Sequence, residues 1–248
     1  MNTRIEFCGV PASGKSSLCA EVHRLLRTRG LRMLDRAGVV EAGLQKRDFG
    51  WLGNRLAAWV PGWRCKFLGM PHGLNDWHRF AVGHPVFVAQ IHGWLADAET
   101  DENWRSTVFY ALLATAFEFE LANMAGMPTL LDEGFAQRFF TLRGYRGLGR
   151  TGDAAVYATI MPRPEGLVLV ETPAAICENR LEQRAALPVL LEDNNSLGRR
   201  LGEGQILLVE LAAELERRGV PVLRTDGSGD LVSEASRIAD FIVSILKP

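Results

Sequence analysis

The fold of this 248-residue chain is decided by one stretch near its start, Gly9-Val10-Pro11-Ala12-Ser13-Gly14-Lys15-Ser16. The stretch matches G-x-x-x-x-G-K-[ST], in which loop amides and a helix N-terminus face phosphates, the lysine neutralises their charge and the hydroxyl ligates magnesium. A glycine turn that merely joined a strand to a helix would not need a lysine there. We therefore expect this loop to bind the phosphates of a nucleoside triphosphate.

The cofactors predicted from this loop are ATP and Mg²⁺. Pro11 has no amide hydrogen, so the other loop amides must donate to the phosphates. The metal is expected on the Ser16 hydroxyl. The residues expected to contact the nucleotide here are Gly9, Pro11, Ala12, Ser13, Gly14, Lys15, Ser16 and Ser17.

The segments around the loop have the patterns of a strand and a helix. Residues 4–8 form an apolar strand pattern, and residues 15–29 carry apolar side chains at helical spacing up to Gly30. Further strands are predicted at 31–34, 129–131, 167–170 and 220–223, in alternation with helices. Such alternation predicts a parallel sheet covered on both faces, an α/β fold of three layers, α/β/α, in a single domain over residues 1–248.

Between residues 44 and 105 this alternation stops, and the stretch holds all six tryptophans. We interpret it as a helical insertion and a candidate acceptor-binding element, with Trp77 and Arg79 as candidate contacts. The same aromatic residues could instead pack the insertion onto the sheet, which is the commoner role. An apolar stripe of period 3.6 from Phe109 to Met124 then predicts a long helix leading into the strand at 129–131.

That strand ends in two carboxylates, Asp132 and Glu133. Open α/β sheets bind their ligands at the carboxyl ends of the strands, and phosphoryl transfer uses one carboxylate near the metal and another near the acceptor hydroxyl. We assign Asp132 as the base and Glu133 to the metal, although the reverse fits nearly as well. Glu133 could also simply favour the N-terminus of the helix that follows.

Through these elements the chain resembles P-loop nucleoside and nucleotide kinases, with a thymidylate-kinase-like order of elements. The likeness rests on the loop at 9–16, on Asp132-Glu133-Gly134 and on the segment 167–184. It implies a five-stranded sheet of order 2-3-1-4-5 and a lid over residues 180–204. It also implies that the turn at 225–227 borders the adenine, which adds Asp226 to the nucleotide contacts.

The arginines are candidates for contacts to phosphate and to the acceptor. Arg180 and Arg184 lie four residues apart on a predicted helix and share a face. By the resemblance they reach the transferring phosphate, where arginines stabilise charge in the transition state; a solvated helix face is the alternative. Arg36 and Arg138 are candidate acceptor-binding residues.

The leading hypothesis is an ATP-dependent kinase that acts on a nucleoside, a nucleotide or another small hydroxyl acceptor, with Lys15, Asp132, Glu133, Arg180 and Arg184 in the chemistry. The alternative is an ATPase or switch that acts through a protein partner.

A formal net charge of -1 provides no field to attract nucleic acid or a membrane, so neither is an expected partner. Four scattered cysteines indicate a reducing compartment, the cytoplasm. The oligomeric state is left open, a homodimer included.

Overall fold

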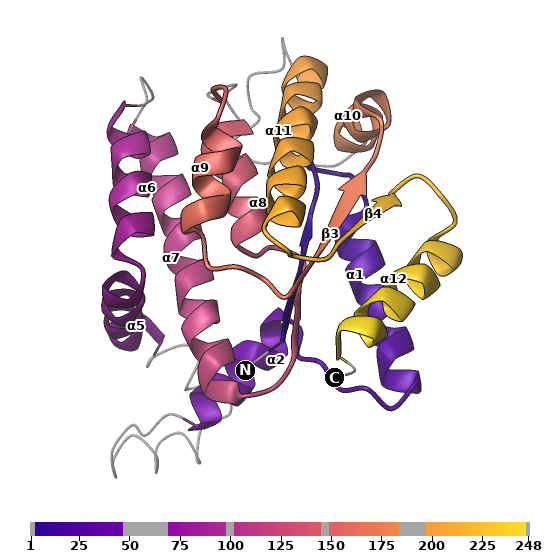
Figure 1. Cartoon of the computed structure of the whole chain (residues 1–248), viewed down its shortest axis with the longest axis horizontal. Coiled ribbons are helices and arrows are strands. Elements are labelled where there is room, and N and C mark those ends of the chain that lie inside the picture. The colour runs from indigo at the N-terminus through magenta and orange to yellow at the C-terminus, as the bar shows by residue number, and fades with distance from the viewer. Residues whose placement is uncertain (1–2, 47–68, 98–101, 145–148, 184–196, 247–248) are drawn as a thin grey trace.

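The computed structural model of this protein describes residues 3–46, 69–97, 102–144, 149–183 and 197–246 (Figure 1). The described strands are β1 (Arg4–Cys8), β2 (Thr129–Leu131), β3 (Gly166–Glu171) and β4 (Val222–Asp226). The helices are α1 (Lys15–Thr28), α2 (Arg36–Lys46), α5 (Gly69–Gly83), α6 (Pro85–Asp97), α7 (Glu102–Ala125), α8 (Phe135–Phe139), the π-helical turn η1 (Phe140–Gly144), α9 (Asp153–Ile160), α10 (Ala174–Glu182), α11 (Leu197–Arg217) and α12 (Leu231–Leu246).

The four described strands form one parallel sheet in the order β2-β1-β3-β4. β1 lies inside the sheet, between β2 and β3. β2 follows β1 by more than a hundred residues in the chain. Parallel pairing needs crossover connections, and helices supply them here. The α/β class and the parallel sheet predicted from the sequence are therefore confirmed.

The strand predicted at 31–34 is reduced to a single parallel bridge between Leu34 and Thr129, beside β2. The prediction of five strands was thus wrong for the described residues, which form four strands and this bridge. Two contacts divert the chain: the Met33 carbonyl bonds the His23 ring at 2.8 Å, and Asp35 accepts the Gly38 amide at 2.7 Å and starts α2. β4 also begins and ends later than predicted, so that Asp226 is the last residue of the strand.

Helices cover both faces of the sheet and make it the middle layer of three. One face packs on α1 and α12, while α7, α8, α9 and α11 gather over the other (Figure 1). Side chains of β3 alternate between the two cores: Val168 and Val170 contact the α1 and α12 side, and Leu167 and Leu169 the opposite side. All four are at most 1% exposed.

The long helix predicted before β2 is confirmed as α7, which packs on α2, α5 and α8. Gly43 makes the α2–α7 contact close, because a Cβ there would lie 2.6 Å from the Cβ of Leu121. By length and composition α7 is also the one described helix apolar enough to cross a membrane. This is weak support for a membrane span, because a core helix passes the same test and α7 buries Glu118.

Candidate functional site

The glycine-rich loop, residues 9–16, follows β1 and ends in the first turn of α1. It turns through two left-handed residues, Ala12 with φ 62° and Gly14 with φ 95°. Gly9 is required for a different reason: a Cβ there would lie 2.6 Å from Ser13 Oγ and 2.8 Å from the Val170 carbonyl. The sequence therefore folds this segment into a tight turn against the end of β3.

Contacts from distant parts of the chain hold the backbone of this loop. Thr172, just after β3, donates its hydroxyl to the Ser13 carbonyl at 2.8 Å. Arg180 of α10 donates to the Ala12 carbonyl at 3.1 Å and to the Gly227 carbonyl at 3.2 Å. The loop, the last turn of α10 and the turn after β4 are thereby joined into one unit.

The polar groups inside the loop differ in their hydrogen-bond partners and in their exposure to solvent. The Gly9 amide, expected to contact nucleotide, instead donates to Gln137 of α8 at 3.1 Å. Ser13 Oγ is buried and has no hydrogen-bond partner among the described residues. Lys15 is 8% exposed and sits at the first position of α1, whereas Ser16 and Ser17 are exposed. A buried orphan hydroxyl costs free energy, so the loop fits a ligand that supplies hydrogen-bond acceptors or donors.

The Ser16 hydroxyl lies next to the acidic strand end: Ser16 Oγ donates to Asp132 Oδ2 at 3.0 Å. Ser16 belongs to α1 and Asp132 follows β2, so the β2–β1 pairing brings the two together. A hydroxyl and a carboxylate oxygen are hard ligands of the type that Mg²⁺ prefers. These residues therefore fit a divalent cation with few protein ligands and several waters. The described residues contain no group of three or more His, Cys, Asp or Glu that could hold a metal, at this site or at any other.

Glu133 forms an ion pair with Arg138, 3.0 Å away. Arg138 is buried and also donates to Thr115 of α7 at 2.7 Å. The N-terminus of α8, which Glu133 might have served, is bonded by another carboxylate: the Ala136 amide donates to Glu6 Oε2 at 2.8 Å.

Glu6 itself is fully buried in β1 and paired with Arg4 at 2.9 Å. Its carboxyl group occupies the space where residue 134 would carry a Cβ, since that atom would lie 2.1 Å from Glu6 Cδ. Gly134 is therefore required for β1 to support the strand end that carries Asp132.

A third ion pair, which the sequence did not reveal, joins Arg36 at the start of α2 to Glu118 of α7, with 2.5 Å between Nε and Oε1. The Arg36 side chain is 47% exposed and that of Glu118 6%. Burial opposes the charge of Arg36, but Glu118, followed by Glu133 and Asp132, raises its pKa. Burial raises the pKa of Glu118, against the opposing effect of Arg36 and Arg138. A glutamate inside the apolar stripe of a predicted helix was the available signal.

Two cavities flank the loop. The first, of about 440 Å³, lies between α1 and the start of α2. Burial, and after it the charges of Asp132 and Asp35, raise the pKa of the Cys19 thiol in its wall, so both carboxylates lie near this thiol. The lining residues are Ser16, Cys19, Ala20, His23, Asp35, Arg36, Ala37, Leu130 and Asp132.

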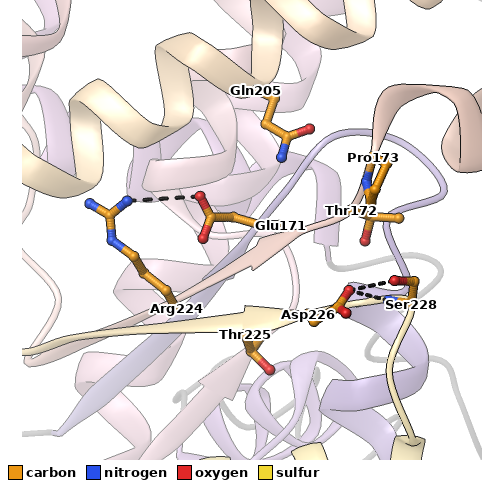
Figure 2. A pocket seen from close by; sticks show the side chains of 8 residues that line it. All are labelled: Glu171, Thr172, Pro173, Gln205, Arg224, Thr225, Asp226 and Ser228. Carbon is orange, nitrogen blue, oxygen red and sulfur yellow. Dashed lines mark hydrogen bonds and ion pairs between the residues drawn. The ribbon is translucent and has the colours of Figure 1, made fainter.

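The second cavity, of about 450 Å³, lies at the carboxyl ends of β3 and β4 (Figure 2). Asp226 accepts the amide and the hydroxyl of Ser228, at 2.8 and 2.6 Å, and these bonds lower its pKa. Across the cavity Arg224 lies 3.8 Å from Glu171. Gln205 of α11 also lines the cavity. The cavity and the loop are neighbours, because the Gly227 turn touches the loop: a Cβ on Gly227 would lie 1.9 Å from the Ser13 carbonyl oxygen.

Other predicted site residues are not brought to these cavities. Trp77 packs between Phe80 and Phe109, at ring distances of 5.9 and 5.7 Å, which matches the packing alternative. Arg79 is exposed on α5 and lines neither cavity. Arg184 lies outside the described residues, as do most of the lid expected at 180–204 and three of the tryptophans (Trp51, Trp59 and Trp63).

No protein-family model matches this chain, and no curated protein matches it. The candidate site therefore consists of the loop, the strand end and the two cavities. Together these features place a hydroxyl, a buried lysine, a carboxylate and two ligand-sized spaces at the carboxyl edge of one parallel sheet, where open α/β sheets bind their ligands.

Proposed function

We propose that this protein is a P-loop kinase that transfers the γ-phosphoryl group of ATP to a hydroxyl group of a small molecule. The observation that carries the proposal is the 3.0 Å hydrogen bond between Ser16 and Asp132. P-loop NTPases hold Mg²⁺ between a loop Ser or Thr and a carboxylate at the end of a neighbouring strand. The Leu34 bridge supports the P-loop fold, because it lies at the sheet edge where a second strand is expected in the order 2-3-1-4-5.

On this proposal the nucleotide spans the loop and the cavity of Figure 2. The phosphates lie against the loop amides and Lys15, and the base lies in the cavity between Glu171 and Asp226. The left-handed Gly14 and the orphan hydroxyl of Ser13 support a phosphate at the loop. The metal, when bound, neutralises charge on the β- and γ-phosphates.

The geometry favours carboxylate roles that differ from both alternatives considered from the sequence. Asp132 belongs on the metal side, because Ser16 donates to it. Glu133 is held by Arg138 and does not line the cavity beside Ser16. The carboxylate that lines this cavity with Asp132 is Asp35, whose Oδ1 caps α2. We assign Asp35 as the group that accepts the proton of the acceptor.

The transfer then needs the acceptor hydroxyl in the cavity between α1 and α2. Its oxygen forms a bond to the γ-phosphorus, and the bond from that phosphorus to the β–γ bridging oxygen breaks. ADP leaves with the electron pair of that bond, and the hydroxyl proton passes to Asp35. The cavity of about 440 Å³ holds a small molecule such as a nucleoside or a sugar. A dedicated second cavity favours a kinase over an ATPase or switch, which has no small acceptor to bind.

The test is magnesium- and ATP-dependent release of ADP across nucleosides, nucleotides, sugars and amino alcohols. Stimulation by one class, with formation of its phosphorylated product, supports the proposal. Lys15→Ala should lower turnover on the order of 10²- to 10³-fold, because the lysine neutralises phosphate charge. Lys46→Ala is the control, since Lys46 donates to the Ala125 carbonyl between α2 and α7. Equal turnover in wild type and Lys15→Ala contradicts the proposal.

A further inference from the structure

The cavity between α1 and α2 is notable for how its charges are paired. Arg36 is its one arginine, and its guanidinium bonds Glu118 at 2.5 Å through Nε. Glu118 is almost wholly buried, so the pair is shielded from solvent on one side. An arginine bound to a buried carboxylate has its charge offset before any ligand enters.

The remaining charges near this cavity are mainly negative among the described residues. Asp35 and Asp132 line it, and Glu133 lies close enough to Arg36 to raise the pKa of that guanidinium. Arg138, whose charge also acts on Glu118, is bonded to Glu133 and Thr115. Two arginines thus face four carboxylates, Asp35, Glu118, Asp132 and Glu133. A divalent cation at Ser16 and Asp132 would arrive with nucleotide phosphates that carry further negative charge.

From this arrangement we infer that the acceptor is a hydroxyl compound without a phosphate or carboxylate group, either neutral or cationic, and that Glu118 enforces this choice by neutralising Arg36. The inference rests on the proposed function and narrows its acceptor class. Asp35 and the Asp132 side of the cavity offer oxygens that accept hydrogen bonds from hydroxyl or ammonium groups. An anionic acceptor would meet like charge at close range, which disfavours binding.

Matched pairs of acceptors test the inference on the wild-type protein. Each pair consists of a hydroxyl compound and its phosphomonoester: a nucleoside and its 5′-monophosphate, a hexose and its 6-phosphate, an amino alcohol and its phosphate. The unphosphorylated member of the active pair should have a kcat/KM at least about tenfold higher. A preference for the phosphomonoester overturns the inference and leaves the kinase proposal standing. Absence of stimulation by every pair, with Lys15→Ala equal to wild type, overturns the proposed function itself.

Inorganic phosphate provides a second readout that does not depend on turnover. With Mg²⁺ and a non-hydrolysable ATP analogue filling the loop, Glu118→Gln should bind phosphate on the order of tenfold more tightly than wild type by calorimetry, because Arg36 gains a free charge. The double variant Arg36→Gln/Glu118→Gln should lose that gain. Glu214→Gln is the matched control, since Glu214 pairs with Arg217 at 2.7 Å on α11. Equal phosphate affinity in wild type and Glu118→Gln overturns the role of Glu118.

Discussion

Ser16 and Asp132 are 116 residues apart in the chain, yet the hydroxyl of one donates to the carboxylate of the other at 3.0 Å. The first residue lies in the first turn of α1 and the second directly follows β2, so their contact depends on the pairing of β1 with β2. On the proposed function, a metal ligand set divided between two segments in this way links nucleotide binding to the sheet. The same contact favours a role for Asp132 as a metal ligand over a role as the base.

Asp132→Asn should lower turnover about a hundredfold and raise the Mg²⁺ concentration needed for half-maximal rate, because an amide is a poorer magnesium ligand than a carboxylate. A magnesium titration of the rate measures this. Glu133→Gln should leave the magnesium requirement near that of wild type, since Glu133 is paired with Arg138. The assignment fails if Asp132→Asn reduces the rate with an unchanged magnesium requirement.

Arg180→Ala should raise the KM for ATP roughly tenfold with a smaller change in kcat, because its hydrogen bonds hold the Ala12 and Gly227 carbonyls rather than the transferring phosphate. Steady-state kinetics with varied ATP give both constants. Arg217→Ala, at an exposed arginine that pairs with Glu214 outside the predicted lid, should change neither. A large fall in kcat at constant KM would instead place Arg180 on the phosphate.

Gly134→Ala should destabilise the protein by about 1–3 kcal/mol, because the new Cβ would overlap the buried Glu6 carboxyl group. Urea unfolding measures the change. Gly202→Ala is the contrasting control: this glycine of α11 has open space around the position of a Cβ, so alanine should stabilise by roughly 0.5–1 kcal/mol. Equal effects of the two substitutions would rule out the overlap.

Stability should respond to pH through Glu118. Burial raises the pKa of this carboxyl in the folded protein above the ordinary 4.5 that we take for the unfolded chain. The folded state therefore binds more protons than the unfolded state just above pH 4.5, so the Glu118 contribution to stability falls as pH rises through this window. Urea unfolding across pH, in wild type and in Glu118→Gln, isolates this contribution. The free energy of unfolding should fall less steeply with rising pH in the variant than in wild type. A steeper decline in the variant would reverse the sign.

Local patterns predicted most of the fold because they reflect short-range constraints. The loop at 9–16, the helix α1 and the long helix α7 follow from glycine positions and apolar spacing alone. The strand at 31–34 failed because a side-chain contact, His23 to Met33, competes with the sheet.

The candidate site was harder to predict than the fold. Asp132 was found because it follows an apolar strand, but its partner Ser16 fixes its role. The Arg36–Glu118 pair depends on how α2 packs on α7, across 82 residues, and the role of Arg180 depends on where the Gly227 turn lies. Such pairings are set by tertiary packing, and no spacing in the sequence encodes them.

The strand order has a consequence for synthesis of the chain. β1 emerges first from the ribosome, but its neighbours are β2, which begins at Thr129, and β3, which begins at Gly166. At translation rates of about 5–20 residues per second, β1 waits roughly 6–24 s for its first partner. The nascent amino-terminal half carries the whole loop motif, yet Thr172, Arg180 and Gly227 have still to be made. On the proposed function, nucleotide binding should therefore be acquired only near the end of translation, and a chain that stops early should bind chaperones through β1 rather than ATP.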